Sequence, residues 1–251
     1  MAKNIVVGVY RFLGYHLCCH LLDLGEEVIG IEMEEEVIAD RDDKAMTFGR
    51  NANFVYQSLE EFTETDEESL VCICLLDYAM AGSQSWQRMR KKIGYIIEKC
   101  KAPRRRILIF LPYELDSDRQ KEVEQLRNEL RKQDNIQWIR MTDVYGPWLP
   151  EHVDIKAASC LPRALYIEDF CKEWDALLAI GQEEVTVTGE LQEDWQEQIA
   201  NFHSGEPGNR HPDIMDSPDM LIIKAYTSLE DGLQAMREHQ MKRRLFQNWR
   251  E

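Results

Sequence analysis

Short apolar runs alternate with amphipathic stretches over residues 1–145 of this 251-residue chain. This alternation is the pattern of repeated βα units, in which a helix follows each strand of a parallel sheet. The sequence therefore predicts an α/β fold with a doubly wound parallel sheet. The predicted strands cover residues 4–9, 27–32, 53–57, 70–76, 106–111 and 136–141.

The stretches between these strands predict three helices. Residues 12–24 carry leucines at helical spacing, and Gly25 is placed to cap the end of that helix. Residues 84–100 form a second helix, and residues 116–133 form a third. The third helix begins with Asp116 and carries many opposite charges four residues apart, so we expect it to lie on the surface.

The regular alternation of apolar runs and amphipathic stretches ends in the C-terminal part of the chain. Residues 167–180 predict a helix, and residues 184–187 predict a strand that can still join the sheet. Residues 203–218 are rich in Gly, Pro, Asn and Asp, which is typical of a loop. The segment Thr227–Glu230, with the sequence Thr-Ser-Leu-Glu, is a capping box that opens a terminal helix.

Charge and composition restrict the partners of the chain. Its net charge of −16 repels phosphate backbones, which argues against binding of nucleic acid. No apolar run approaches the roughly 20 residues that span a bilayer. The seven cysteines are an odd number and fall mostly in apolar segments, which favours buried thiols over a disulfide framework. We expect a cytoplasmic protein that binds neither nucleic acid nor a membrane.

A turn that carries two glycines lies between the first strand and the first helix. It runs from Gly8 to Gly14 and includes Arg11, Phe12 and Leu13. In a Rossmann fold this turn brings backbone N–H groups and a helix N-terminus against a pyrophosphate. The usual motif has a third glycine where this chain has Arg11 or Phe12. A tight turn that binds nothing therefore stays an alternative.

The end of the second predicted strand adds an acidic residue to this turn. Glu32 stands where an acid accepts hydrogen bonds from the ribose hydroxyls of adenosine. The turn is similar to that of the short-chain dehydrogenase/reductase superfamily, and the place of Arg11 resembles that of an arginine that contacts the 2′-phosphate of NADP in its single-domain branch. Glu32 would repel that phosphate. The choice between NAD and NADP therefore stays open, and Arg11 can also be a surface residue that covers the start of the helix.

Four ordered segments resemble the extended short-chain dehydrogenase/reductase family, of the NAD-dependent epimerase/dehydratase type. The glycine turn and its helix resemble the opening of these enzymes. Residues 139–147 resemble their Arg-x-x-x-Val-Tyr-Gly-Pro signature, and residues 164–170 resemble their Tyr-Val-x-Asp-Val segment. Residues 228–233 resemble their C-terminal Leu-Glu-Glu-Gly-Leu helix. The resemblance spans nearly the whole chain.

The resemblance implies a domain organisation and a set of partners. It implies a Rossmann-like dinucleotide-binding domain over residues 1–147, joined by residues 164–190, and a reduced substrate-type subdomain over residues 191–251. NAD or NADP would lie on the first part, and a nucleotide-sugar-like or other small substrate would lie under the second. It also implies a homodimer, although the charge of the helix at residues 116–133 leaves a monomer open.

The catalytic residues of that family are missing from their places. These enzymes use a tyrosine as acid/base, a lysine four residues later and a Ser/Thr at the end of the fifth strand. Ser117 stands four residues before Lys121, and the fifth strand leads into Tyr113 without Ser or Thr. Tyr95 and Lys99 have the right spacing but lie on the helix before that strand. Tyr113 and Lys121 are the remaining catalytic candidates.

The spacing of other reactive residues suggests no further chemistry. His16 and His20 could share a metal on one helix face, but the sequence places no third ligand, and we expect no metal site. The sequence thus predicts a non-catalytic, degenerate relative of the family, in effect a pseudoenzyme. It would act as a nucleotide sensor, scaffold or regulator and bind a dinucleotide, a small molecule or a protein partner. The alternative is an unorthodox oxidoreductase or epimerase that uses Tyr113.

Overall fold

The structure is a computed structural model that describes residues 3–33, 38, 40–62, 69–100, 105–153, 161–192 and 219–248. These residues form an eight-stranded sheet in the order β10-β9-β6-β5-β4-β1-β2-β3, and β1 pairs in parallel with both β2 and β4. The predicted Rossmann-like fold is therefore confirmed. The strands are β1 (Lys3–Val7), β2 (Glu27–Glu32), β3 (Phe54–Ser58), β4 (Leu70–Cys74), β5 (Arg106–Pro112), β6 (Ile136–Met141), β9 (Glu184–Gly189) and β10 (Met220–Ile223).

Contacts divide the chain into two compact units. Unit 1 comprises Met1–Arg140 and Gln182–Glu184, and unit 2 comprises Met141–Gly181 and Val185–Glu251. The sequence predicted that the first domain ends at residue 147, a few residues after Arg140, where the main segment of unit 1 ends. The strand predicted at residues 184–187 joins the sheet as β9, as expected.

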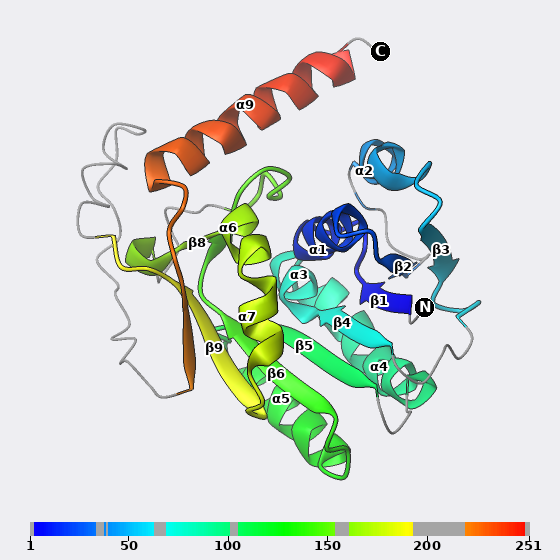
Figure 1. Ribbon diagram of the computed structural model, residues 1–251. Helices are drawn as coiled ribbons and strands as arrows, with labels where there is room; N and C mark the ends of the chain where they lie inside the picture. The colour runs from blue at the N-terminus through cyan, green and yellow to red at the C-terminus, as the bar shows by residue number, and fades with distance from the viewer. Residues whose placement is uncertain are drawn as a thin grey trace. The chain divides into compact units, whose positions relative to one another are not determined.

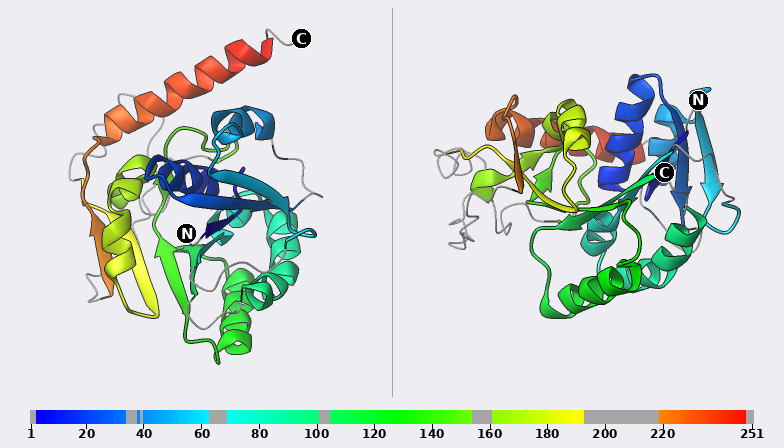
Figure 2. Two further views of the ribbon diagram at one scale, coloured as in Figure 1. Left: turned by 45° about the vertical axis from the view of Figure 1, so that its right-hand side comes forward. Right: turned by 60° about the horizontal axis from the view of Figure 1, so that its bottom comes forward.

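Unit 1 has helices on both faces of its strands. Figures 1 and 2 show α4 and α5 on one face and α1 on the other. Ile5 and Val7 of β1 belong to the hydrophobic cluster under α4 and α5, while Val6 is fully buried on the opposite face. Burial on both faces explains why the strands are continuous apolar runs. The helices of unit 1 are α1 (Phe12–Asp23), α2 (Arg41–Phe48), α3 (Leu75–Met80), α4 (Ser83–Lys99) and α5 (Ser117–Leu130).

Several predicted element ends in unit 1 differ from the structure by one to three residues, and one of the differences bears on function. The strand predicted to reach residue 76 ends at Cys74, where α3 begins directly. Leu75 and Leu76 look like further strand residues because they are apolar, but they are buried as the first turn of α3. This early turn places Asp77 at the carboxyl end of β4, beside β1. The helix predicted at residues 116–133 ends earlier, at Leu130.

Unit 2 contains a second small sheet and three α-helices among its described residues. β7 (Val144–Tyr145) pairs in parallel with β8 (Leu165–Tyr166), after a 3-10 turn η2 (Leu161–Arg163). The helix predicted at residues 167–180 is divided at Glu173, whose ψ of 18° leaves the helical range. The loop predicted at residues 203–218 lies outside the described residues. The α-helices are α6 (Ile167–Lys172), α7 (Trp174–Ala179) and α9 (Leu229–Asn248).

The capping box of the terminal helix is shifted by one residue from the prediction. Ser228 Oγ accepts the backbone N–H of Asp231 at 3.1 Å and donates to its carboxylate at 2.7 Å. Thr227 instead donates its hydroxyl to Asp169 of α6, at 3.1 Å. The buried carboxylate of Asp169 also accepts the backbone N–H groups of Tyr226 and Thr227. A contact distant in sequence therefore decides which residue caps α9.

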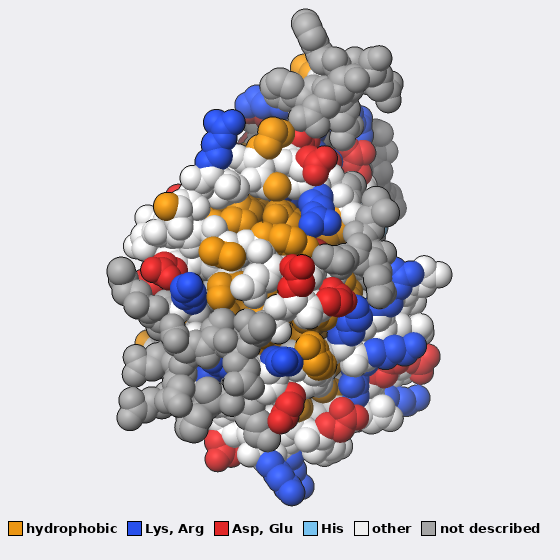
Figure 3. All heavy atoms as spheres, turned by 90° about the vertical axis from the view of Figure 1, so that its right-hand side faces the viewer, with side chains coloured by type: hydrophobic (Ala, Val, Ile, Leu, Met, Phe, Trp, Pro, Cys, Tyr) orange, Lys and Arg blue, Asp and Glu red, His pale blue; other side chains and the backbone are white. Residues whose placement is uncertain are grey.

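Hydrophobic side chains gather on the face of unit 1 shown in Figure 3, which carries α2 and β3. β3 is an edge strand of the sheet. Met46 of α2 and Val55 of β3 are 62% and 45% exposed. Unit 1 thus presents apolar side chains beside a sheet edge.

Candidate functional site

The glycine turn keeps the backbone geometry of a dinucleotide-binding turn at its two ends. Gly8 has a φ of +91°, which side chains of L-residues rarely adopt. A Cβ on Gly14 would lie 2.0 Å from the carbonyl oxygen of Gly8, so only glycine lets α1 start this close to β1. Both predicted glycines are therefore required by the backbone.

Arg11 stands in the middle of the turn, and its side chain is folded inward. It is 7% exposed, and its guanidinium carbon lies 3.8 Å from the ring centroid of Tyr78 on α3. Its Nε donates to Oε1 of Glu32 at 3.3 Å. Two residues that the sequence predicted to contact a cofactor thus contact each other.

Glu32 is fully buried at the end of β2. Besides Arg11, its Oε1 accepts the hydroxyl of Tyr78 at 2.9 Å and the backbone N–H of Met33 at 3.2 Å. Its second oxygen, Oε2, has no hydrogen-bond partner among the described residues. An orphaned buried carboxylate oxygen can accept one further donor, such as a ribose hydroxyl.

The N-terminus of α1 is capped by a carboxylate from another helix. Arg11 is the N-cap residue, and its side chain makes no capping hydrogen bond. Asp77 of α3 supplies the cap instead, because its Oδ1 accepts the N–H of Leu13 at 2.8 Å and its Oδ2 accepts that of Gly14 at 3.0 Å. These N–H groups have no partner within the helix and belong to the positive end of its dipole.

Burial disfavours the ionised form of the Asp77 carboxyl group. Burial raises its pKa from 3.8 to about 6, although the N–H groups of Leu13 and Gly14 oppose that rise. Arg11 and Lys44 oppose it as well, through their positive charges. Lys44 is itself buried on α2 and donates to the carbonyl oxygen of Tyr10 at 2.9 Å. The turn is therefore surrounded by two cations and two carboxylates.

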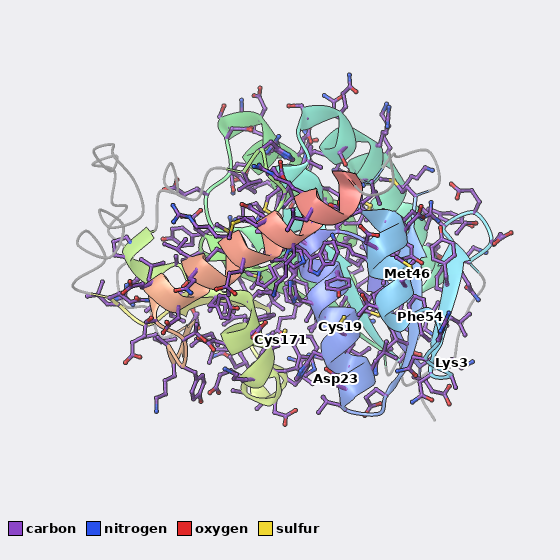
Figure 4. The ribbon with its side chains drawn as sticks, turned by 90° about the horizontal axis from the view of Figure 1, so that it is seen from above. Lys3, Cys19, Asp23, Met46, Phe54 and Cys171 are labelled. Carbon is purple, nitrogen blue, oxygen red and sulfur yellow. The ribbon has the colours of Figure 1, made fainter. Side chains whose placement is uncertain are left out.

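Helix α2 holds Lys44 in place by packing along α1. Tyr15 of α1 donates its hydroxyl to Thr47 at 3.3 Å and packs its ring on Phe48, with the centroids 5.7 Å apart. Figure 4 shows the two helices side by side, with Cys19 labelled on α1 and Met46 on α2. This short helix was not predicted, since charged residues fill its first turn and hide its apolar spacing.

A dinucleotide pyrophosphate does not fit the turn in this arrangement. It would need the N–H groups of α1 that Asp77 already accepts, and the Asp77 carboxylate would repel it. Arg11 occupies the place of the glycine that lets a pyrophosphate approach the backbone. Among the described residues around the turn, Oε2 of Glu32 is suited to a dinucleotide, as an acceptor for ribose. Phe12 and Leu13 are buried and offer backbone groups alone.

The two catalytic candidates have separate surroundings. Lys121 directs its ammonium group to Asp118 on the same helix, at 3.7 Å, and its side chain is 70% exposed. Tyr113 follows β5, and its carbonyl oxygen accepts a hydrogen bond from Arg140 at 3.4 Å. Tyr95 lies on an exposed part of α4 with the Lys99 ammonium 5.6 Å from its ring centroid, as expected of a surface pair.

The Val-Tyr-Gly-Pro segment packs within unit 2. Gly146 has a φ of +150°, and the rings of Tyr145 and Tyr166 lie 5.4 Å apart. A Cβ on Gly232 of α9 would lie 2.7 Å from the Tyr145 ring, so glycine lets α9 approach β7. The Tyr145 hydroxyl is buried and has no hydrogen-bond partner among the described residues. This segment therefore has a packing role.

The described residues contain no candidate metal site and no membrane-spanning helix. No group of three or more His, Cys, Asp or Glu side chains among the described residues could hold a metal ion. The described cysteines, Cys18, Cys19, Cys72, Cys74, Cys100 and Cys171, are free thiols. No described helix is long and apolar enough to cross a membrane.

Sequence reasoning missed Asp77, the residue that decides what the turn can hold. The sequence feature that could have identified it is an acidic residue that follows closely after the apolar run of β4. The carboxyl ends of parallel strands lie along one edge of a sheet, which is the edge where ligands bind. Knowing that β4 pairs with β1 would have placed Asp77 beside the glycine turn.

Comparison with solved structures finds enzymes of one fold over nearly the whole chain. The dTDP-glucose 4,6-dehydratase of Bacillus anthracis, in complex with NAD, matches with a TM-score of 0.62 and 11% identity, covering 96% of this chain and 97% of that chain. The NAD-dependent NDP-hexosamine 5,6-dehydratase TunA matches with a TM-score of 0.61 and 12% identity, covering 96% and 98%.

A reductase matches equally broadly. The yeast methylglyoxal/isovaleraldehyde reductase Gre2, complexed with NADPH, has a TM-score of 0.59 and 11% identity, with 96% of this chain and 98% of that chain covered. No family model matches the chain, and no curated protein matches it. The chain therefore has the fold of these NAD- and NADPH-binding dehydratases and reductases.

Proposed function

We propose that this chain is a non-catalytic protein with a dehydratase/reductase fold, which works as a scaffold or regulator through a protein partner and holds no dinucleotide on its glycine turn. The observation that carries the proposal is the Asp77 carboxylate on the N-terminus of α1. It supplies from within the chain the hydrogen bonds that a pyrophosphate would make.

The surroundings of the turn support the same conclusion. Arg11 and Glu32, the two side chains that the sequence predicted to face a cofactor, form a buried ion pair with each other. Breaking such a buried pair costs several kcal/mol, on the order of 3 to 5, because it leaves a charge uncompensated. A dinucleotide would have to compensate this cost and that of displacing Asp77 before any net binding.

The catalytic candidates support a non-catalytic role. A tyrosine works as acid/base at neutral pH only when a nearby cation lowers its pKa. Lys121 forms an exposed ion pair with Asp118 on the same helix. A protein without this chemistry acts through what it binds, and the exposed apolar side chains of α2 and β3 give unit 1 a surface for a protein.

Binding of all four nicotinamide dinucleotides to the full chain tests the proposal. Thermal unfolding is followed with NAD, NADH, NADP and NADPH, because a ligand that binds the native state raises the melting temperature. A dinucleotide-dependent dehydratase of the same fold serves as the positive control. We expect no shift for this chain, and a saturable rise with any of the four would contradict the proposal.

Turnover measurements separate the proposal from an unorthodox oxidoreductase. Nucleotide sugars and small carbonyl compounds are incubated with the chain and each dinucleotide, and the products are followed by mass spectrometry. We expect no conversion. Conversion that is abolished in Tyr113→Phe and kept in Tyr95→Phe would establish the enzyme and overturn the proposal.

A further inference from the structure

Strand β3 ends the sheet that the described residues form, and its outer edge is suited to a further strand. The N–H of Val28 on β2 donates to the carbonyl oxygen of Asn53 at 2.8 Å, so that carbonyl faces β2. Successive residues of a strand direct their peptide groups to opposite sides, so those of Phe54 and Tyr56 point away from β2. Proteins usually protect such an edge with lysine or proline, and β3 contains neither.

The charges of this edge are arranged around Val55. Residues 51–59 are all uncharged, in a chain in which 30% of the residues are charged. Val55 is the middle residue of this segment, and Arg50 and Glu60 flank its two ends. The net charge of −16 makes two copies of the chain repel each other. A neutral segment with opposite charges at its ends is therefore a place where two copies can approach.

The side chains of β3 leave Val55 for a partner to cover. The ring of Phe54 packs on Phe48 of α2, with the centroids 4.5 Å apart, and the ring of Tyr56 lies 5.5 Å from that of Tyr10. Both rings are thus held within their own copy. Val55 points to the opposite face of the sheet, because side chains alternate along a strand, and it is 45% exposed.

We infer that β3 binds a second copy of this chain, with the two β3 strands antiparallel about a two-fold axis beside Val55. Each Val55 then faces its counterpart, and Phe54 of each copy faces Tyr56 of the other. The N–H of Phe54 already donates to the carbonyl oxygen of Asn51 at 3.1 Å. The carbonyl of Phe54 therefore accepts the N–H of Tyr56 of the other copy, once on each side of the axis.

This arrangement also suits the surroundings of β3. It brings Arg50 of each copy to the end of the strand where Glu60 of the other copy lies, so opposite charges meet twice. The two-fold axis keeps both α2 helices on one face of the joined sheet. Met46 of α2, 62% exposed, adds apolar surface on the face of unit 1 shown in Figure 3. The inference rests on the proposed function in that it names a partner for the α2 and β3 surface.

Three lysine substitutions at equally exposed apolar positions test the inference. Val55→Lys puts two like charges face to face at the axis. Ile222→Lys makes the same kind of change on β10, the other edge strand, and Tyr95→Lys makes it on α4. The three side chains are 45%, 48% and 46% exposed, so the cost of the substitution itself is matched. Sedimentation velocity of each full chain over a range of concentrations measures its association.

We expect the wild type, Ile222→Lys and Tyr95→Lys to associate into dimers as the concentration rises. Val55→Lys should raise the dissociation constant at least about tenfold. A wild type that stays monomeric throughout would overturn the inference. Dimers that persist in Val55→Lys would show that another face is used, and equal losses in all three variants would show that added charge alone prevents association. Either result would overturn it as well.

Val55→Cys provides a second variant if circular dichroism shows that Val55→Lys does not fold. Directly opposite Cβ atoms of an antiparallel pair lie about 4.5 to 5.5 Å apart, which is close to disulfide geometry. Oxidation with diamide should therefore link Val55→Cys into a covalent dimer on non-reducing gels, in excess of the wild type and Ile222→Cys. The absence of that excess would overturn the inference and leave the non-catalytic assignment standing. Binding of NAD by the wild type would instead contradict the proposed function.

Discussion

Replacing Asp77 by asparagine should change how the stability of the chain depends on pH. The carboxyl group has a pKa of about 6 in the fold, raised by burial from its usual 3.8. Because the folded pKa lies above the unfolded one, the group stabilises the fold fully below pH 3.8 and loses that contribution as the pH rises through 6. The difference between the two pKa values corresponds to about 3 kcal/mol.

Asparagine has nearly the same shape and does not titrate. Its amide NH₂ group faces one of the two N–H donors of α1, so Asp77→Asn should be less stable than the wild type in acid by about 1 to 3 kcal/mol. As the pH rises from about 3.5 to 7.5, the free energy of unfolding of the variant should increase relative to that of the wild type by about 3 kcal/mol. Near neutral pH the variant should therefore be at least as stable as the wild type.

Urea unfolding at a series of pH values measures this change. Both proteins are followed by circular dichroism, and equal m-values show that the same surface is exposed on unfolding. Asp118→Asn is the matched control, since it makes the same substitution at a side chain that is 88% exposed. A constant difference for Asp77→Asn, or one that moves in favour of the wild type as the pH rises, would refute the reasoning.

Three further predictions concern packing and charge. Gly14→Ala should destabilise the chain by more than about 3 kcal/mol, since its Cβ would lie 2.0 Å from a backbone oxygen. Gly94→Ala, at a helical position with nothing within 4 Å, should stabilise it by about 0.5 to 1 kcal/mol; equal effects in urea unfolding would contradict the packing argument. Hydrogen bonding to Arg127 and Arg140 lowers the pKa of Glu184 from 4.5 to about 2, so its contribution is present above pH 4.5 and lost as the pH falls through 2. Its side chain is 39% exposed, so Glu184→Gln should reduce the loss of stability in acid by only about 1 kcal/mol, and an unchanged acid profile would count against the pair. Asp169→Ala should destabilise the chain by about 2 to 4 kcal/mol and lower its melting temperature, because it leaves the backbone N–H groups of Tyr226 and Thr227 without their acceptor. A similar loss in the exposed Asp175→Ala would argue against this.

The sheet could be predicted closely because its strands are buried on both faces. The bounds of β2 and β6 agree with the predicted ranges, and the other predicted strands differ by one or two residues at one or both ends. The helices α2 and α3 were missed for opposite reasons. α2 is short and rich in charge, while α3 begins with Leu75 and Leu76, which continue the apolar run of β4.

The members of the candidate site could be located from sequence, but not their interactions. Gly8 and Gly14 were predicted from local backbone requirements, and Glu32 from its place at the end of β2. That Arg11 pairs with Glu32 depends on a side chain turning inward over Tyr78, which a linear pattern does not specify. The capping of α1 by Asp77 joins residues more than 60 positions apart and follows only from the strand order.

A crystal structure of the wild-type chain grown with excess NADH would test the central claim most directly. We expect the Asp77 carboxylate to lie within hydrogen-bond distance of the N–H groups of Leu13 and Gly14, with Arg11 against Glu32, as in the present structure. A pyrophosphate on those N–H groups, with Asp77 displaced, would contradict it.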